Sequence, residues 1–204
     1  MPAASILPVA LYKNKLYFLF GKENPMENSA SGFSDFGGGM EAGESALDAA
    51  LREGSEELTG FLGTRQDLKK RLKKNGVYKI KYEFDDKNTY TIHIFPMSYD
   101  LEFVKYFNDN HAFLWGKMNK TLLNNSRLFE KIKVDWFCED ELQKRMPEYR
   151  PFYRDIVKTI MSHRANIRSF MRKCVATRRR APIRGRHTRT ISRRKGRVVQ
   201  KGGQ

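Results

Sequence analysis

Alternation of apolar and polar positions, together with short apolar runs, predicts β-strands along the chain. The clearest pattern is a hairpin over 77–97, whose two arms alternate around a polar turn at 85–88. A second hairpin is expected over 4–20, with its turn at 13–15. Shorter strands are expected at 32–36, 61–62 and 131–137.

Apolar residues at spacings of three and four predict helices between these strands. The strongest such pattern runs from Ser45 to Leu58. Residues 100–130 are rich in Asn and aromatic side chains and show neither period, so a loop with short helical turns is expected there. Shorter helices are expected at 67–74, 139–145 and 151–163. Strands wrapped by a few helices indicate an α/β sandwich.

A glycine loop leads into the helix at 45–58 and gives this stretch its chemistry. Three consecutive glycines, 37–39, allow the backbone to approach a ligand closely. Glu53, Glu56 and Glu57 then share one stripe of the helix, where like charges repel unless a cation neutralises them. Hard divalent ions such as Mg²⁺ take such oxygen ligands. A solvated acidic face is the alternative interpretation, which the glycines and Arg52 disfavour.

The stretch resembles the Nudix box, Gly-x5-Glu-x7-Arg-Glu-U-x-Glu-Glu-x-Gly-U, where U is aliphatic. The fixed glycine, arginine and glutamate positions are all matched, by Gly38, Glu44, Arg52, Glu53, Glu56 and Glu57. The departures are Gly54 at an aliphatic position and Thr59 in place of the closing glycine, with Gly60 one residue late. Gly54 is expected to cost about 1 kcal/mol relative to alanine, unless a close neighbour needs the room.

The resemblance implies a Nudix-type α/β/α sandwich with a mixed sheet over about residues 3–162. Outside the box it depends on the order of elements and on the segment 135–142, which looks like the strand and short helix near the end of many Nudix members. The implied domains are a Nudix hydrolase domain at 1–162 and a basic tail at 163–204, helical to about 175 and then disordered.

The resemblance also implies hydrolysis of a diphosphate linked to another moiety, with Mg²⁺ or Mn²⁺ as cofactor. The implied metal ligands are Glu53, Glu56 and Glu57, with the carbonyl of Gly38 or Gly39. Arg52 would hold Glu53, and Glu44 would brace the junction between loop and helix. The general base varies across the family. Candidates are Glu139, Asp140 and Glu141, each of which is equally well explained as a helix N-terminal acid.

Charge divides the chain into two parts. Of the 39 Lys and Arg residues, fifteen lie in 163–204, which contains no Asp or Glu, so residues 1–162 are close to neutral within the overall net charge of +16. Arginine-rich segments bind phosphate backbones without sequence preference and order on RNA. The residues expected to bind nucleic acid are Arg178, Arg179, Arg180, Arg184, Arg186, Arg193, Arg194, Lys195 and Arg197. A nuclear-targeting or solubilising tail and an anionic membrane surface remain as alternatives.

Two cysteines, Cys138 and Cys174, give no disulfide framework, which favours a reducing intracellular compartment, cytoplasm or nucleus. No signal peptide and no membrane-spanning run are expected. Oligomeric state and organism are open. His111, Phe113 and Trp115 are candidates for stacking on a nucleobase, with buried anchoring of the loop as the alternative.

Together these features predict a pyrophosphatase acting on a nucleoside-diphosphate-linked substrate, with the 5′ cap or 5′ polyphosphate of RNA as the first substrate class to test. The layout of a small box domain with a basic tail looks similar to RNA-decapping Nudix enzymes, including viral ones. Two alternatives remain. One is a pyrophosphatase of small nucleotides (dNTPs, nucleotide sugars or dinucleoside polyphosphates) with a localising tail, and the other is an inactive Nudix fold that binds nucleic acid.

Overall fold

The structure is a computed structural model that describes residues 2–24, 31–119, 121–122 and 129–180, with side chains up to residue 176. Its strands are β1 (Ala3–Tyr12), β2 (Lys15–Glu23), β3 (Phe33–Ser34), β4 (Phe36–Gly39), β5 (Tyr78–Asp85), β6 (Asn88–Pro96) and β7 (Lys131–Cys138). Its helices are α1 (Ala46–Glu57), α2 (Arg65–Asn75), α3 (Leu101–Lys117), α5 (Tyr153–Ser162) and α6 (Arg164–Arg180), with a 3₁₀ turn, η2, at Met146–Glu148.

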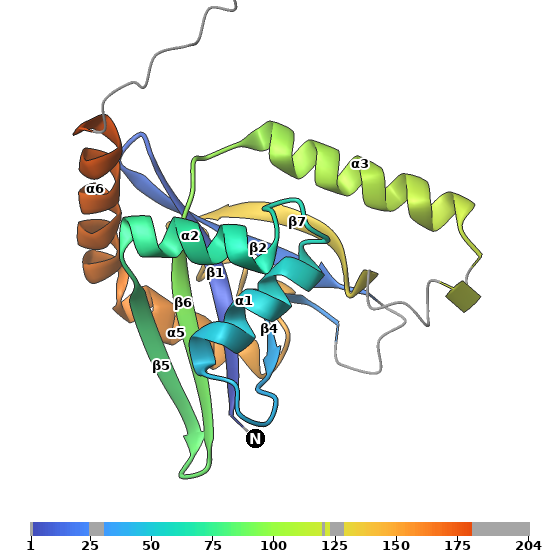
Figure 1. The fold of residues 1–204 in the computed structure, drawn as a ribbon, viewed down its shortest axis with the longest axis horizontal. Coiled ribbons are helices and arrows are strands. Elements are labelled where there is room, and N and C mark those ends of the chain that lie inside the picture. Colours follow the sequence, from blue (N-terminus) through green and yellow to red (C-terminus); the bar gives the residue numbers. More distant parts are fainter. Residues whose placement is uncertain (1, 25–30, 120, 123–128, 181–204) are drawn as a thin grey trace, which may run out of the picture.

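Strand β1 is the centre of a mixed sheet (Figure 1). It runs parallel to β6, pairing Ala3 with Tyr90 and Ile6 with His93, and antiparallel to β2. Its first residues also pair with β4, with Ala4 opposite Gly38. Strand β2 pairs with β7 along its other edge, and its last residues, Gly21 and Lys22, pair with β3 on the edge that faces β1. Strand β5 pairs with β6. Because β1 is buried on both faces, its residues are apolar almost without interruption.

Helices cover the two faces of the sheet and complete an α/β/α sandwich (Figure 1). On one face, α5 and α6 pack Ile156, Ile160 and Ile167 against Leu7 and Phe18. On the other, α1, α2 and α3 pack their apolar sides against side chains that point the opposite way along the same strands, such as Ile6 and Leu19. The α/β fold with a mixed sheet is therefore confirmed.

Most expected elements are present near their expected bounds, including both long hairpins, the helix after the glycines and the last amphipathic helix. Three expectations are wrong. Residues 101–117 form the single helix α3 rather than a loop, capped by the Asp100 side chain, which accepts the N–H of Phe103 at 3.0 Å. Residues 139–145 are turns rather than a helix, and 61–62 is a turn rather than a strand.

The three glycines belong to strand β4 rather than to a free loop, because their backbone pairs with the first residues of β1. At the other end of the chain, the expected division at 162–163 falls between α5 and α6, and α6 itself packs Ile167 and Met171 into the core. Within the described part of the chain, none of the helices combines the length and the apolar character that a membrane span requires.

Candidate active site

Strand β4 and helix α1 meet at the candidate site. Ser45 caps α1 by accepting the N–H of Asp48 at 3.1 Å, so the helix begins one residue after the expected start. Ala50, Leu51 and Gly54 are buried against the sheet. Residues 52, 53 and 56 lie on a different side of α1 from these buried residues. Their charged side chains are therefore directed to the edge of the sheet beside β4.

Arg52 connects most of the site. Its Nε and Nη2 donate to the Glu44 carboxylate at 3.0 and 2.9 Å, and its Nη1 donates to Glu53 Oε1 at 2.7 Å. Nη2 also donates to the Gly39 carbonyl at 3.1 Å, and Glu56 Oε2 lies 3.7 Å from Nη1. The hydrogen bonds from Arg52 lower the pKa of Glu44 to about 2, so that this carboxylate is charged throughout the neutral range.

Gly38 lies directly against the Glu53 carboxylate. A Cβ atom added at Gly38 would lie 2.6 Å from Glu53 Oε1 and 2.7 Å from Glu53 Cδ, which is closer than such atoms approach in proteins. Only glycine therefore lets the backbone of β4 lie against this carboxylate. Arg52 and Gly38 together hold Glu53 in one place, and the Glu53 side chain is only 14% exposed.

A buried ion cluster lies behind the helix and was not expected from the sequence. Lys131 Nζ lies 3.3 Å from Glu57 Oε1, is bonded to Glu23 and donates to Ser34 Oγ at 2.9 Å. Arg150 also donates to Glu23, at 2.7 Å. Burial raises the pKa of Glu57 well above its ordinary value of 4.5, although the charge on Lys131 opposes the rise.

The expected metal ligands differ in their surroundings. Glu56 is half-exposed, Glu53 is bonded to Arg52, and Glu57 is buried beside Lys131. Among the described residues, no group of three His, Cys, Asp or Glu side chains is arranged as a metal cluster. Glu57 Oε2, however, is buried and has no hydrogen-bond partner. A carboxylate oxygen in that state suits a hard divalent cation, so the donor types fit Mg²⁺ or Mn²⁺.

The candidate general bases lie elsewhere in the molecule. Glu139 accepts the N–H of Leu16 at 2.9 Å and binds Arg168, while Asp140 pairs with Lys15 at 2.7 Å. Leu16 pairs with Leu11, and Gly38 pairs with Ala4, seven residues away on β1 and therefore roughly 23 Å along the strand. The structure does not bring this group, which includes Glu141, to the box carboxylates.

The aromatic residues proposed to stack on a base lie on α3. His111 is buried, with its ring stacked on Phe107 at 3.9 Å and its Nδ1 at 2.9 Å from the Phe107 carbonyl, which matches the anchoring interpretation. Trp115 lines a cavity of about 280 Å³ beside it, whereas Phe113 is exposed.

The arginines expected to bind nucleic acid lie at or beyond the end of the described chain. Arg178, Arg179 and Arg180 end the backbone of α6, and their side chains are not described. The remaining ones, Arg184, Arg186, Arg193, Arg194, Lys195 and Arg197, fall outside the described residues.

Comparison with known proteins identifies the fold. No protein-family model and no curated protein matches the sequence. Among solved structures, the Nudix hydrolase RenU from M. smegmatis is 14% identical with a TM-score of 0.51, covering 82% of this chain and 88% of that one. MutT from Aliivibrio salmonicida or Vibrio cholerae is 12% identical with a TM-score of 0.41, covering 80% and 99%. A C. elegans Ap4A hydrolase is 16% identical with a TM-score of 0.36, covering 86% and 95%.

The two lower TM-scores add no support, but the similarity to RenU, at 14% identity, covers most of both chains. The described part of the chain has the fold of a Nudix hydrolase.

Proposed function

We propose that the chain is a Nudix hydrolase that cleaves a diphosphate bond in a nucleoside-diphosphate-linked substrate. The observation that carries the proposal is the network in which Arg52 binds Glu44, Glu53 and the Gly39 carbonyl. Through this network Arg52 bonds both Glu44, in the turn before α1, and Glu53 on the helix, although the two glutamates are nine residues apart. A solvated acidic face would not require such bonds.

Mg²⁺ or Mn²⁺ would be held by Glu53, Glu56 and Glu57, with the Gly38 or Gly39 carbonyl as a further donor. A bound divalent ion supplies charge neutralisation for the phosphates and acidifies a water. The unpartnered Glu57 Oε2 supports this assignment, because a buried carboxylate oxygen without a donor is costly. Lys131 fixes the other oxygen of Glu57.

The side chains of the site have separate roles in the proposed reaction. Arg52 orients Glu53 through a charge-assisted bond at 2.7 Å. Glu44 accepts the N–H of Glu41 at 3.1 Å as well as two Arg52 bonds, so it fixes the turn before α1 to the helix. Four of the five N–H groups of Arg52 donate to protein acceptors, so we assign it the role of a positioning residue rather than a phosphate ligand.

We propose the 5′ end of RNA, capped or polyphosphorylated, as the substrate class. The support is the concentration of positive charge: residues 163–204 contain fifteen Lys or Arg and no acidic residue. Such a segment binds RNA through phosphate contacts and raises the local concentration of 5′ ends at the site. The arginines from Arg178 to Arg197 would make these contacts.

The test is cleavage of cap-labelled RNA with Mg²⁺ or Mn²⁺, with free nucleotides assayed in parallel. The full chain is compared with a chain ending at Ala176, because an earlier truncation would remove Ile167 and Met171 from the core. Release of a nucleoside diphosphate from RNA, slowed by truncation in a salt-sensitive way, supports the proposal. Equal activity of both chains on free nucleotides, and none on RNA, would assign the protein to the small-nucleotide pyrophosphatases.

Glu53→Gln separates an enzyme from a binding module. The amide keeps the shape of the side chain and loses the charge, so metal-dependent hydrolysis should fall by at least about 100-fold while RNA binding by the tail is retained. A protein that hydrolyses no diphosphate, with or without this substitution, would be an inactive Nudix fold.

A further inference from the structure

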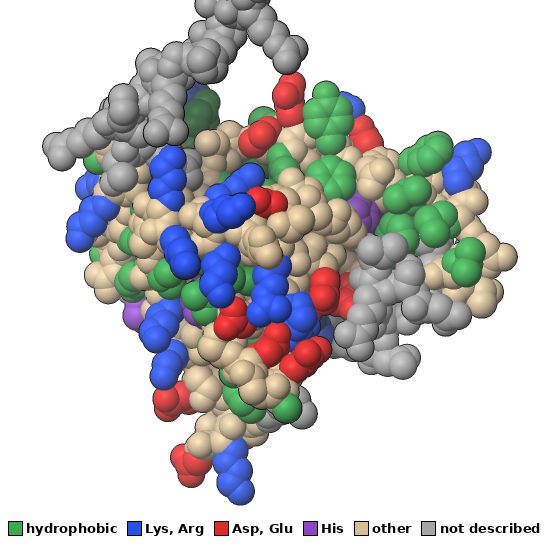
Figure 2. Space-filling model, in the orientation of Figure 1, with side chains coloured by type: hydrophobic (Ala, Val, Ile, Leu, Met, Phe, Trp, Pro, Cys, Tyr) green, Lys and Arg blue, Asp and Glu red, His purple; other side chains and the backbone are tan. Residues whose placement is uncertain are grey.

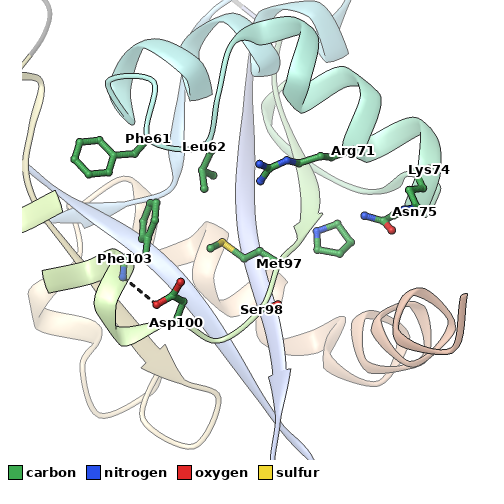
Figure 3. A pocket seen from close by; sticks show the side chains of 10 residues that line it. Phe61, Leu62, Arg71, Lys74, Asn75, Met97, Ser98, Asp100 and Phe103 are labelled. Carbon is green, nitrogen blue, oxygen red and sulfur yellow. Dashed lines mark hydrogen bonds between the residues drawn. The ribbon is translucent and has the colours of Figure 1, made fainter. Parts of the chain in front are cut away.

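A hollow beside α2 combines cationic and aromatic side chains. It has a volume of about 440 Å³ and lies between α2, the turn after α1 and the link from β6 to α3 (Figure 3). Arg71 and Lys74 line it from α2, Phe61 from the turn and Phe103 from the start of α3. The Phe61 ring is 37% exposed and is held edge-on to Phe103, with ring centroids 6.0 Å apart.

The two cations of this hollow, Arg71 and Lys74, form no ion pair with the described part of the protein. In the described residues, no carboxylate lies within ion-pair distance of Arg71 or Lys74. Helix α2 as a whole carries six Lys or Arg and one Asp, a net charge of +5. Figure 2 shows Lys and Arg side chains gathered over α2 and the neighbouring strand β5, where Lys79 and Lys81 are exposed.

The hollow also contains one acceptor, the carboxylate of Asp100. Its Oδ1 accepts the N–H of Phe103 at 3.0 Å as the cap of α3. A carboxylate can accept a hydrogen bond from the 2′-hydroxyl of ribose, a group that DNA lacks. The hollow thus offers a cation for phosphate, an aromatic ring for a base and an acceptor for ribose.

The position of the hollow connects the box with the tail. Phe61 is four residues beyond Glu57, and α2 is tied to α1 by Arg65 and Lys69, which pair with Asp48 at 3.2 and 3.1 Å. The other end of α2 contacts α6, where Cys174 Sγ lies 3.3 Å from the Asn75 carbonyl. Helix α6, which is the described part of the basic tail, thus runs past that end of α2 (Figure 1).

We propose that this hollow and the exposed face of α2 bind single-stranded RNA between the 5′ end and the segment held by the tail. The assignment of this RNA as substrate rests on the proposed function, whereas the binding surface does not. Single-strand sites combine a cationic groove with aromatic side chains on which bases stack. Arg71 and Lys74 contact phosphates, and Phe61 stacks on a base.

The test uses the full chain and a 20-nucleotide RNA with a 5′ hydroxyl, which is not a substrate for diphosphate cleavage. Binding is followed by fluorescence anisotropy at several salt concentrations. The double substitution Arg71→Gln, Lys74→Gln should reduce the slope of log K against log salt by about 1.4, because each lost phosphate contact on a single strand removes about 0.7. Phe61→Leu keeps an apolar side chain but removes the ring, so it should weaken binding with little change of slope; circular dichroism checks that the fold is retained.

The matched control is Lys87→Gln, Lys105→Gln, which removes the same charge from the β5–β6 turn and from α3. Its salt slope should stay within about 0.3 of the unsubstituted chain. An equal reduction of the slope in both double variants, or in neither, would overturn the proposed site.

The same variants connect the site to catalysis. If the proposed function holds, Arg71→Gln, Lys74→Gln raises KM for capped RNA and leaves hydrolysis of free nucleotides unchanged. If the unsubstituted chain hydrolyses no diphosphate but the anisotropy difference is present, the proposed function fails and the RNA surface stands. If hydrolysis is present but KM for RNA is the same in all variants, the RNA surface fails and the enzyme stands.

Discussion

Gly54 occupies a position where the Nudix box usually has an aliphatic residue, and the structure gives the reason. A Cβ atom at residue 54 would lie 2.4 Å from Ile6 Cδ1 and 2.5 Å from Ile6 Cγ1, and Ile6 is fully buried in β1. The large side chain on β1 thus fills the space that an aliphatic residue on the helix would need. The expected cost of glycine to the helix is offset by this packing.

The substitution Gly54→Ala has two opposed effects on the free energy of unfolding. Alanine favours the helix by about 1 kcal/mol, while overpacking a full core costs about 1–3 kcal/mol. We expect a net destabilisation of about 1 kcal/mol. In an Ile6→Ala background the nearest remaining atom, Cβ of residue 6, is at 3.6 Å, an ordinary contact. There the same substitution should stabilise by about 1 kcal/mol or more.

The two backgrounds therefore predict a coupling of about 2 kcal/mol between positions 6 and 54, within the range seen for residues in contact. Chemical denaturation of the four proteins of the cycle, followed by circular dichroism, measures it. Gly116→Ala is the control, because no described atom lies within 4 Å of a Cβ added there, and it should stabilise α3 by up to about 1 kcal/mol. Additive effects, or a Gly54→Ala as stabilising as Gly116→Ala, would refute the packing explanation.

Three further substitutions address the charged groups. Lys131→Met leaves Glu57 and Glu23 buried without their shared cation and should destabilise by about 3–5 kcal/mol in thermal or denaturant unfolding; a loss below about 1 kcal/mol would contradict the buried cluster. Arg52→Lys keeps the charge but not the fork that reaches two carboxylates and a carbonyl, so kcat should fall at least about 10-fold with the fold retained; unchanged kcat would exclude the positioning role. Burial raises the pKa of Asp35 from 3.8 to about 6, so the native state binds the extra proton and the free energy of unfolding falls by about 2 kcal/mol as pH rises from 4 to 6. Asp35→Asn should remove that pH dependence, and an identical pH profile would disprove its origin.

The periodicity of apolar residues predicted those strands and helices that are determined by residues close to one another in the sequence. The hairpin of β5 and β6 follows from strict alternation, and α1 follows from its apolar spacing. Helix α3 was missed because Gly116 and the asparagines obscure its period, although its signal was present in the Asp100 cap and in Phe107 and His111 at a spacing of four.

The elements that depend on distant partners could not be predicted. The glycines of β4 adopt an extended conformation because their backbone pairs with the first residues of β1. The conformational preferences of glycine alone do not predict this pairing. In the candidate site, the box pattern predicted that Arg52 contacts Glu53, but it did not predict that Lys131 lies beside Glu57. That lysine reaches Glu23 across 108 residues of chain, and no local pattern records such a distance.

Pairing of β2 with β7 has a consequence for how the protein is made. On the ribosome, the box and its helix emerge well before β7, so a nascent chain that stops short of residue 131 carries β2 with an unpaired edge. It also carries Glu57 without Lys131, which arrives at the start of β7. The box stretch, although it lies in the first third of the sequence, acquires its last partner late in synthesis, so a prematurely released chain would lack both the β7 edge of the sheet and the ion pair at Glu57.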